Sequence, residues 1–189
     1  MVVMPTIIEK SPTGQERWID IPSKLYSQRI IMLTDIVDDF TGNSTIAQLL
    51  YLDSQNQDDI TIIINSPGGS VLHGLGILDC MRNLKSKVNV VCYGHAASMG
   101  ALLLSSGTGQ RKASKNARIM LHPLSSGTEG TIHDMNIDHK ESLYLQDKLN
   151  KIIAENTGQK LAKVKKDFQR DKWFSAEEAL DYGLIDVII

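Results

Sequence analysis

The sequence has few cysteines, and they lack the spacings that give cysteine a special role. Its 189 residues include two, Cys80 and Cys92, with no Cys-x-x-Cys pair and no Cys/His ligand pattern around them. A disulfide framework or a zinc site needs such spacing. Both cysteines lie among apolar residues, so we expect buried free thiols and a reducing compartment.

The chain also lacks a strong charge of either sign. Its formal net charge is −2, and the basic residues are dispersed except for the short cluster Lys163–Lys166. We interpret that cluster as a solvated helix face. Nucleic acids and anionic membranes attract proteins with a concentrated basic surface. We therefore expect neither as a partner.

Long apolar runs are missing as well. No stretch approaches the roughly 18 apolar residues of a membrane span, and Met1–Pro5 lack the basic region of a signal peptide. We expect a cytoplasmic chain that is neither exported nor anchored. Low-complexity segments and fixed-period repeats are also absent. At 42% hydrophobic residues, the chain is long enough for one well-cored domain, residues 1–189.

The sequence does contain an alternation of short β-branched runs and amphipathic segments. The expected strands are 30–33, 60–64, 88–93, 117–121 and 184–188. The expected helices are 44–52, 71–85, 101–104, 132–156, 160–168 and 176–182. This alternation predicts an α/β protein.

Two of these helices have sequence signals at their ends. Thr157-Gly158 is a typical stop for the long helix 132–156, and Ser175 with Glu178 forms a capping box before a last helix that stops at Gly183. Residues 1–22 are apolar and then turn-rich around 11–14, a pattern that favours a hairpin-like arm.

One serine lies where an expected strand meets an expected helix. Ser98 is part of the small-residue stretch Tyr93–Gly100, which follows the strand 88–93. At such a junction the first free N–H groups of the helix can stabilise negative charge beside the serine hydroxyl. Ser98 is therefore our candidate nucleophile. Small residues also let a helix pack closely on a sheet, and this stretch alone does not decide between the two.

A glycine loop and a histidine are the other candidates. Pro67-Gly68-Gly69 follows the strand 60–64, and two glycines allow a backbone to turn its N–H groups toward an oxyanion. A plain turn fits equally well. His122 ends a strand beside Pro123 and is the best placed of five histidines, ahead of His73, His95, His133 and His139.

Four motifs together carry a resemblance to a known family. They are SPGGS at 66–70, GHAASMG at 94–100, MLH at 120–122 and AEEALDYGLID at 176–186. In this order, and with supporting likeness from residue 4 to the C-terminus, the chain resembles ClpP, the family of proteolytic subunits of the Clp protease. The resemblance implies the ClpP/crotonase-like fold of repeated β-β-α units, an N-terminal axial arm at 1–22, and a protruding long helix, the handle, at about 125–157.

The resemblance also implies roles for single residues. Ser98 matches the nucleophile, His122 the general base and Asp171 the acid that orients the base. The backbone N–H groups of Gly69 and Met99 match the oxyanion hole. Arg170 matches a residue in the contact between rings.

An assembly is implied in the same way. Two stacked heptameric rings of this chain would enclose a chamber in which unfolded polypeptides are cut to short peptides. An AAA+ Clp ATPase would unfold and feed the substrates, so the chain itself would need neither cofactor nor metal, and ATP would be used only by that partner.

The chain departs from the family's usual pattern at several positions. Pro123 follows His122 where the family has His-Gln-Pro, and Thr61 and Ile63 replace tyrosines of the ATPase-docking pocket. Gln169 replaces an acidic residue. The loop 107–111 is one residue shorter than usual, and Lys115 replaces a proline.

Two alternatives to a self-sufficient peptidase remain. The departures favour a divergent paralogue that is weakly active alone and acts in a mixed ring with a second ClpP. A crotonase-type acyl-CoA enzyme would use Gly69 in an oxyanion hole for a thioester enolate. It leaves Ser98, His122 and Asp171 without a joint role.

Overall fold

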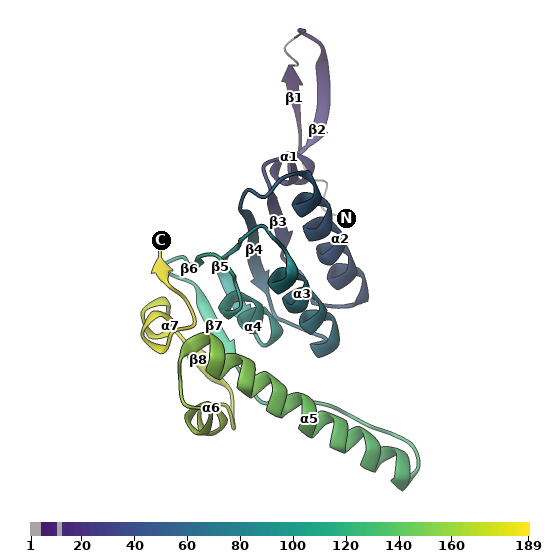
Figure 1. Cartoon of the computed structure of the whole chain (residues 1–189), viewed down its shortest axis with the longest axis vertical. Coiled ribbons are helices and arrows are strands. Elements are labelled where there is room, and N and C mark those ends of the chain that lie inside the picture. The colour runs from purple at the N-terminus through teal and green to yellow at the C-terminus, as the bar shows by residue number, and fades with distance from the viewer. Residues whose placement is uncertain (1–4, 11–12) are drawn as a thin grey trace.

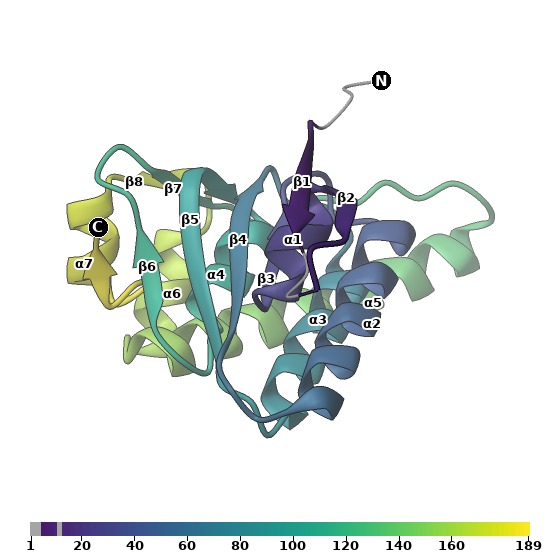
Figure 2. The same cartoon turned by 90° about the horizontal axis from the view of Figure 1, so that it is seen from above.

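A seven-stranded sheet lies at the centre of the computed structural model, which describes residues 5–10 and 13–189 (Figures 1 and 2). Five of its strands run parallel in the order β3-β4-β5-β6-β9. Their bounds are Ile30–Leu33, Ile60–Ser66, Val88–Ala97, Arg111–Ala113 and Val187–Ile188. Parallel strands joined through helices are the arrangement of an α/β protein, and the predicted fold class is confirmed.

Strand β5 is the longest strand of the sheet and joins its two halves. Its first half pairs with β6, whereas His95–Ala97 pair in parallel with β7 (Arg118–Leu121). Strand β7 in turn pairs antiparallel with β8 (Lys172–Phe174). Since β5 ends at Ala97, the next residue, Ser98, leaves the sheet beside the end of β7.

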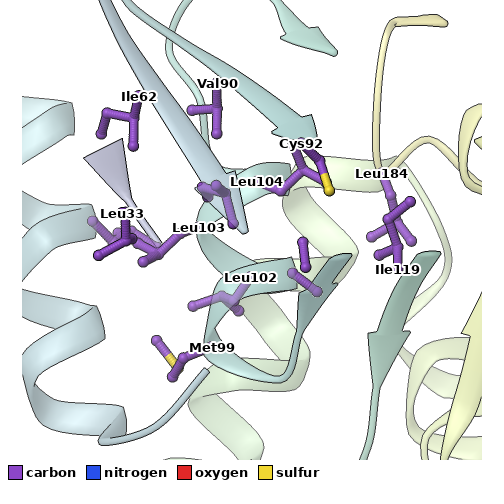
Figure 3. Close-up of a cluster of buried hydrophobic side chains, with 14 of the residues drawn as sticks. Leu33, Ile62, Val90, Cys92, Met99, Leu102, Leu103, Leu104, Ile119 and Leu184 are labelled. Carbon is purple, nitrogen blue, oxygen red and sulfur yellow. The ribbon is translucent and has the colours of Figure 1, made fainter. Parts of the chain in front are cut away.

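Helix α4 (Met99–Ser105), which follows Ser98, is the most deeply buried helix. All seven of its residues are buried, and its leucines belong to the same hydrophobic cluster as Ile62 and Val90 of the neighbouring strands (Figure 3). A helix that is apolar on every side is stable only inside a core, and each fully buried leucine contributes about 2 kcal/mol. The core therefore fixes the point at which the chain turns at Ser98.

The other helices pack around this unit. Their bounds are α1 Ile21–Ser27, α2 Asp39–Gln55, α3 Val71–Asn83, α5 Ile132–Thr157, α6 Leu161–Asp167 and α7 Ala176–Tyr182. Helices α2 and α3 lie side by side, and α5 extends away from the sheet (Figure 1). The long helix ends at Gly158, whose φ of 69° is left-handed as the predicted stop requires.

The N-terminal arm is a hairpin that stands apart from the sheet (Figure 1). Strands β1 (Thr6–Lys10) and β2 (Glu16–Asp20) pair antiparallel, and most of their residues are exposed. The hairpin-like arm expected from the sequence is confirmed for this part of the chain. The expected arm also included Met1–Met4, and the expected turn included Ser11 and Pro12, all of which lie outside the described residues.

Several expected boundaries were wrong. Helix α2 begins at Asp39 and not at Ser44, because the Asp38 side chain accepts a hydrogen bond from the Thr41 N–H and the Asp38 N–H donates to the Thr41 hydroxyl. This polar first turn has no apolar stripe, so it resembled a loop. Strand β5 continues through the stretch that we expected to be an elbow, with Gly94 at a φ of 84°.

Two short strands were missed, and one expected strand differs. Strand β6 was not expected, and the segment 171–174, expected as a connection, contains β8. The segment 125–130, part of the handle that the resemblance implies, forms no strand within the described chain. The closing strand covers 187–188 and not 184–188. Each error involves pairing between residues far apart in sequence, which local patterns do not report.

The expected thiols and the last capping box are present. Cys80 is half-buried and Cys92 is buried, both free, and burial raises the pKa of the Cys92 thiol to about 12. Ser175 and Glu178 form the predicted capping box. In the Lys163–Lys166 cluster the lysines are exposed, as expected, and Val164 between them is buried.

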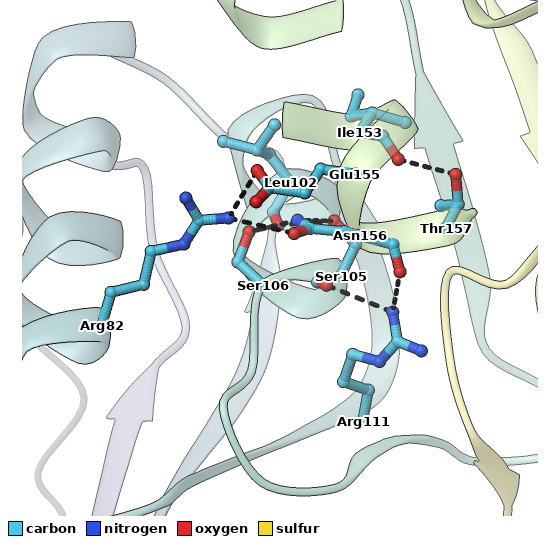
Figure 4. A network of polar contacts seen from close by, with 9 residues as sticks. All are labelled: Arg82, Leu102, Ser105, Ser106, Arg111, Ile153, Glu155, Asn156 and Thr157. Atoms are coloured by element: carbon cyan, nitrogen blue, oxygen red, sulfur yellow. Dashed lines mark hydrogen bonds and ion pairs between the residues drawn. The ribbon is translucent and has the colours of Figure 1, made fainter. Parts of the chain in front are cut away.

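A polar network ties the end of α5 to α4 and β6 (Figure 4). The Asn156 amide donates to the hydroxyls of Ser105 and Ser106, at 3.3 and 2.9 Å. The Arg111 guanidinium donates to the carbonyls of Asn156 and Ser105, and Arg82 reaches the Asn156 side chain at 3.1 Å. These contacts hold the C-terminal end of α5 against the end of α4 and against β6, so the face of α5 near Ser98 has a fixed position.

Candidate active site

Ser98 occupies a strained turn between β5 and α4. Its φ is 53° and its ψ −120°, a region that a residue with a side chain seldom adopts. Such strain costs on the order of 1 to 3 kcal/mol and persists only where the surroundings enforce it. Here the buried helix α4 on one side and the hydrogen bond from the Ser98 N–H to the Met120 carbonyl, at 2.8 Å, enforce it. The turn places the hydroxyl outside the core.

His122 reaches Ser98 because of the register between two strands. Ala97 is paired with Met120 in the parallel β5–β7 ladder, so Ser98 and His122 follow at the same edge of the sheet. The His122 Nε2 lies 2.8 Å from the Ser98 Oγ. This is the distance at which a histidine can take a proton from a serine hydroxyl. Of the five histidines, His122 is the one that contacts Ser98.

The glycine loop lies directly on this turn. Gly68 and Gly69 have φ values of 90° and 150°, and the loop is held by Val37, whose N–H donates to the Gly68 carbonyl at 2.8 Å. A Cβ on Gly68 would lie 2.7 Å from the Ser98 Cβ and from the Met99 nitrogen. The loop can approach so closely only because this residue is glycine.

Two backbone N–H groups remain free next to Ser98. Within the described residues, neither the Gly69 N–H nor the Met99 N–H donates to a protein acceptor. The Met99 N–H is one of the unpaired donors at the start of a helix. Both residues line the same cavity as Ser98. Free N–H groups in such a place can bind an oxyanion.

The cavity beside Ser98 and His122 is mainly apolar. Its apolar walls include Leu102, Leu149, Ile153 and Phe168. Two amide side chains of α5, Gln146 and Asn150, also line it. Neither residue was among the candidates expected from the sequence, although an asparagine next to Leu149 on the apolar face of a helix was a usable signal.

Asp171 lies near His122 but does not contact its ring. The antiparallel β7–β8 ladder ends with the pair Leu121 and Lys172, so His122 and Asp171 are the next residues beyond this last pair. Asp171 is exposed and does not line the cavity. Over residues 5–10 and 13–189, no hydrogen bond or ion pair joins it to His122. Arg170, its neighbour, is exposed on the same turn. The structure thus brings together Ser98, His122, Gly69 and Met99, and leaves the Asp171 carboxylate apart.

A second carboxylate near this turn, Asp167, is fully engaged elsewhere. It accepts hydrogen bonds from Lys163 at 2.8 Å and from the Tyr182 hydroxyl at 2.9 Å, and Lys172 lies 3.2 Å away. Burial by itself raises the pKa of Asp167, but the hydrogen bonds outweigh burial and lower the pKa to about 2. Asp167 is therefore ionised at neutral pH and joins α6, β8 and α7.

The Asp167 carboxylate makes the free energy of unfolding depend on pH. Because the folded pKa of Asp167 lies below the value of 3.8 for a free aspartate, its contribution is present above pH 4 and lost as the pH falls toward 2. We expect Asp167→Asn to lower the free energy of unfolding by about 1 kcal/mol at pH 7, since the side chain is 18% exposed and partly screened. Urea unfolding at pH 7 and pH 3 should show a smaller difference between wild type and variant at pH 3. Asp181→Asn on the neighbouring helix is the matched control, and an equal loss in both variants would contradict the assignment.

A comparison with protein families identifies the family of this chain. A family model described as Clp protease matches residues 13–189, which include the glycine loop, Ser98, His122 and Asp171. The chain belongs to the Clp protease family. It is therefore a ClpP-type peptidase, and members of the Clp protease family generally form rings that work with Clp ATPases. No helix in the described part of the chain is long and apolar enough to span a membrane.

Proposed function

We propose that the chain is a serine endopeptidase in which Ser98 is the nucleophile and His122 the general base. The observation that carries this proposal is the 2.8 Å contact between the Ser98 Oγ and the His122 Nε2 at the mouth of a cavity. Family membership adds peptide bonds as the substrate class. It also disfavours the acyl-CoA alternative, which gives the Ser98 and His122 pair no role.

In the proposed mechanism His122 takes the hydroxyl proton as Ser98 attacks the scissile carbonyl carbon. The negative oxygen that forms is bound by the N–H groups of Gly69 and Met99. His122 then gives its proton to the leaving amine, and the C–N bond breaks to leave an acyl-enzyme. Water, deprotonated by His122, attacks the ester and releases the acid and Ser98. The reaction needs no cofactor or metal.

Asp171 is proposed as the acid that orients His122. The β7–β8 register supports this role because Asp171 and His122 directly follow its last pair, Lys172 and Leu121. Its carboxylate must turn inward to accept a hydrogen bond from the His122 Nδ1–H, so the triad is complete only after a side-chain movement. A triad that is incomplete in the single chain is the observation that favours the alternative of a weakly active paralogue. In that alternative, a second ClpP in a mixed ring completes the triad.

The handle, at about 125–157, is proposed as the contact between two stacked heptameric rings. Its outer half is exposed and carries large apolar side chains, among them Ile132 at 78%, Ile137 at 65% and Tyr144 at 61% exposure. Side chains of this kind on one protruding helix are typical of an interaction surface. Arg170 is proposed to contribute to the same contact. An AAA+ Clp ATPase would feed unfolded proteins into the enclosed chamber in the cytoplasm, and only that partner would hydrolyse ATP.

Cleavage of an unfolded protein tests the function. The purified chain is incubated with casein alone, with an AAA+ Clp ATPase and ATP, and with a second ClpP, and the products are sized by mass spectrometry. We expect short peptides in at least one mixture. Products with the chain alone support a self-sufficient peptidase, and products only with the second ClpP support the mixed ring. Intact casein in every mixture, with a folded chain, contradicts the proposal.

A further inference from the structure

The α5 wall of the cavity carries a pair of amide side chains one helical turn apart. Gln146 is half-buried, and Asn150 is only 7% exposed among apolar neighbours. A buried amide costs free energy unless its polar atoms find partners. The pair therefore has to be oriented by specific contacts, and these contacts determine what it offers to a ligand.

One backbone group orients both amides. The Leu124 N–H donates to the Gln146 Oε1. Because a backbone N–H can only donate, the Gln146 oxygen is the atom that faces Leu124. The Gln146 Nε2 is then directed toward Asn150 and donates to its Oδ1 at 3.3 Å. Asn150 in turn keeps its oxygen toward Gln146 and its nitrogen away from it.

Pro123 contributes to this arrangement. Proline has no N–H, so Leu124 carries the first backbone donor after His122. In the family's usual His-Gln-Pro order a proline, which has no N–H, would stand at position 124. In this chain Leu124 stands there, and its N–H fixes Gln146 two residues after the candidate base.

The Asn150 nitrogen is free to bind a ligand. Within the described residues, the Asn150 Nδ2 donates no hydrogen bond. No fully buried side-chain nitrogen or oxygen of these residues lacks a partner. The nitrogen is therefore not sealed off, and Asn150 borders the cavity that contains Ser98. The polar group that the α5 wall offers to this cavity is an N–H donor.

We propose that this cavity is a specificity pocket for an amide-bearing side chain, glutamine or asparagine, at the residue whose carbonyl Ser98 attacks. The inference rests on the proposed function and names its preferred substrates. The amide oxygen accepts from the Asn150 Nδ2, and the methylene groups pack on Leu149 and Ile153. A carboxylate would also accept, but burying a charge in this apolar pocket is costly.

Isosteric peptide pairs test the hydrogen bond without a change of shape. Asparagine and leucine differ at this position only by an amide in place of an isopropyl group, so the ratio of their kcat/KM values isolates the contact. In Asn150→Asp the donor becomes an acceptor at constant volume, while Gln146 keeps its contact. We expect the asparagine-to-leucine ratio to fall about tenfold from wild type to Asn150→Asp. Asn116→Asp, the same change at an exposed turn, should leave the ratio unchanged.

A ratio that stays within twofold in Asn150→Asp overturns the proposal. If that variant does not fold, Asn150→Leu serves instead and should lower the ratio to a similar extent. Non-cleavable peptides, in which the scissile amide is reduced, provide a second measurement that needs no turnover. A tenfold change in their ratio of dissociation constants without any cleavage by wild type contradicts the proposed function and keeps the pocket assignment. Cleavage by wild type, with an asparagine-to-leucine ratio that is unchanged in Asn150→Asp, overturns the pocket assignment and keeps the proposed function.

Discussion

Replacing Ser98 with alanine is expected to lower kcat/KM for peptide cleavage by about 10⁴-fold or more. The variant keeps the cavity and the two free N–H groups but has no oxygen to attack the carbonyl. Its stability should stay close to that of wild type, because alanine meets the same strain at a φ of 53° as serine does. Peptidase assays and thermal unfolding measure the two effects separately.

Ser125→Ala is the matched control for this experiment. Ser125 lines the same cavity but makes no hydrogen bond with His122 in the described chain, so this variant should retain activity. The double variant Ser98→Ala/His122→Ala should be no less active than Ser98→Ala alone, because the pair acts as a unit. More than 1% residual activity in Ser98→Ala would place the nucleophile elsewhere.

Replacing Gly68 with alanine is expected to damage both stability and activity. A Cβ there would lie 2.6 Å from the Ala97 carbonyl oxygen and 2.7 Å from the Met99 nitrogen, and the φ of 90° is unfavourable for alanine. The loop must move off the Ser98 turn, which displaces the Gly69 N–H. We expect a loss of about 3 kcal/mol in the free energy of unfolding and of about 100-fold in kcat/KM.

Gly158→Ala separates crowding from backbone strain. Gly158 also has a positive φ, 69°, but no atom lies within 4 Å of a Cβ built on it. This variant should lose about 1 kcal/mol and keep its activity. Urea unfolding and steady-state kinetics on both variants provide the comparison. Equal effects in the two variants would show that the close contact between the glycine loop and Ser98 is unimportant.

Local patterns predicted much of the fold and the centre of the candidate site. The apolar run before Tyr93 and the apolar run after Gly100 mark a strand and a buried helix, and the only serine or threonine between them is Ser98. His122 was predictable because a strand end is where a parallel sheet gathers functional side chains. These signals are local, and the structure shows both residues in contact.

Other features depend on pairing that no local pattern reports. The position of Asp171 depends on the antiparallel register of β7 with β8, a strand of three residues that had the pattern of a connection. The amide pair of Gln146 and Asn150 is oriented by the Leu124 N–H, more than twenty positions earlier in the chain. The polar start of α2 at Asp38 was missed because its signal is a cap and not an apolar stripe.

The central claim is that Ser98 is a nucleophile activated by His122. Labelling of the purified chain by a fluorophosphonate, alone and mixed with a second ClpP, with the adduct located by peptide mass spectrometry, tests it most directly. The account predicts an adduct on Ser98 in at least one of these samples and its loss in His122→Ala. An adduct on another serine, or an unmodified Ser98 in both samples, would contradict the account.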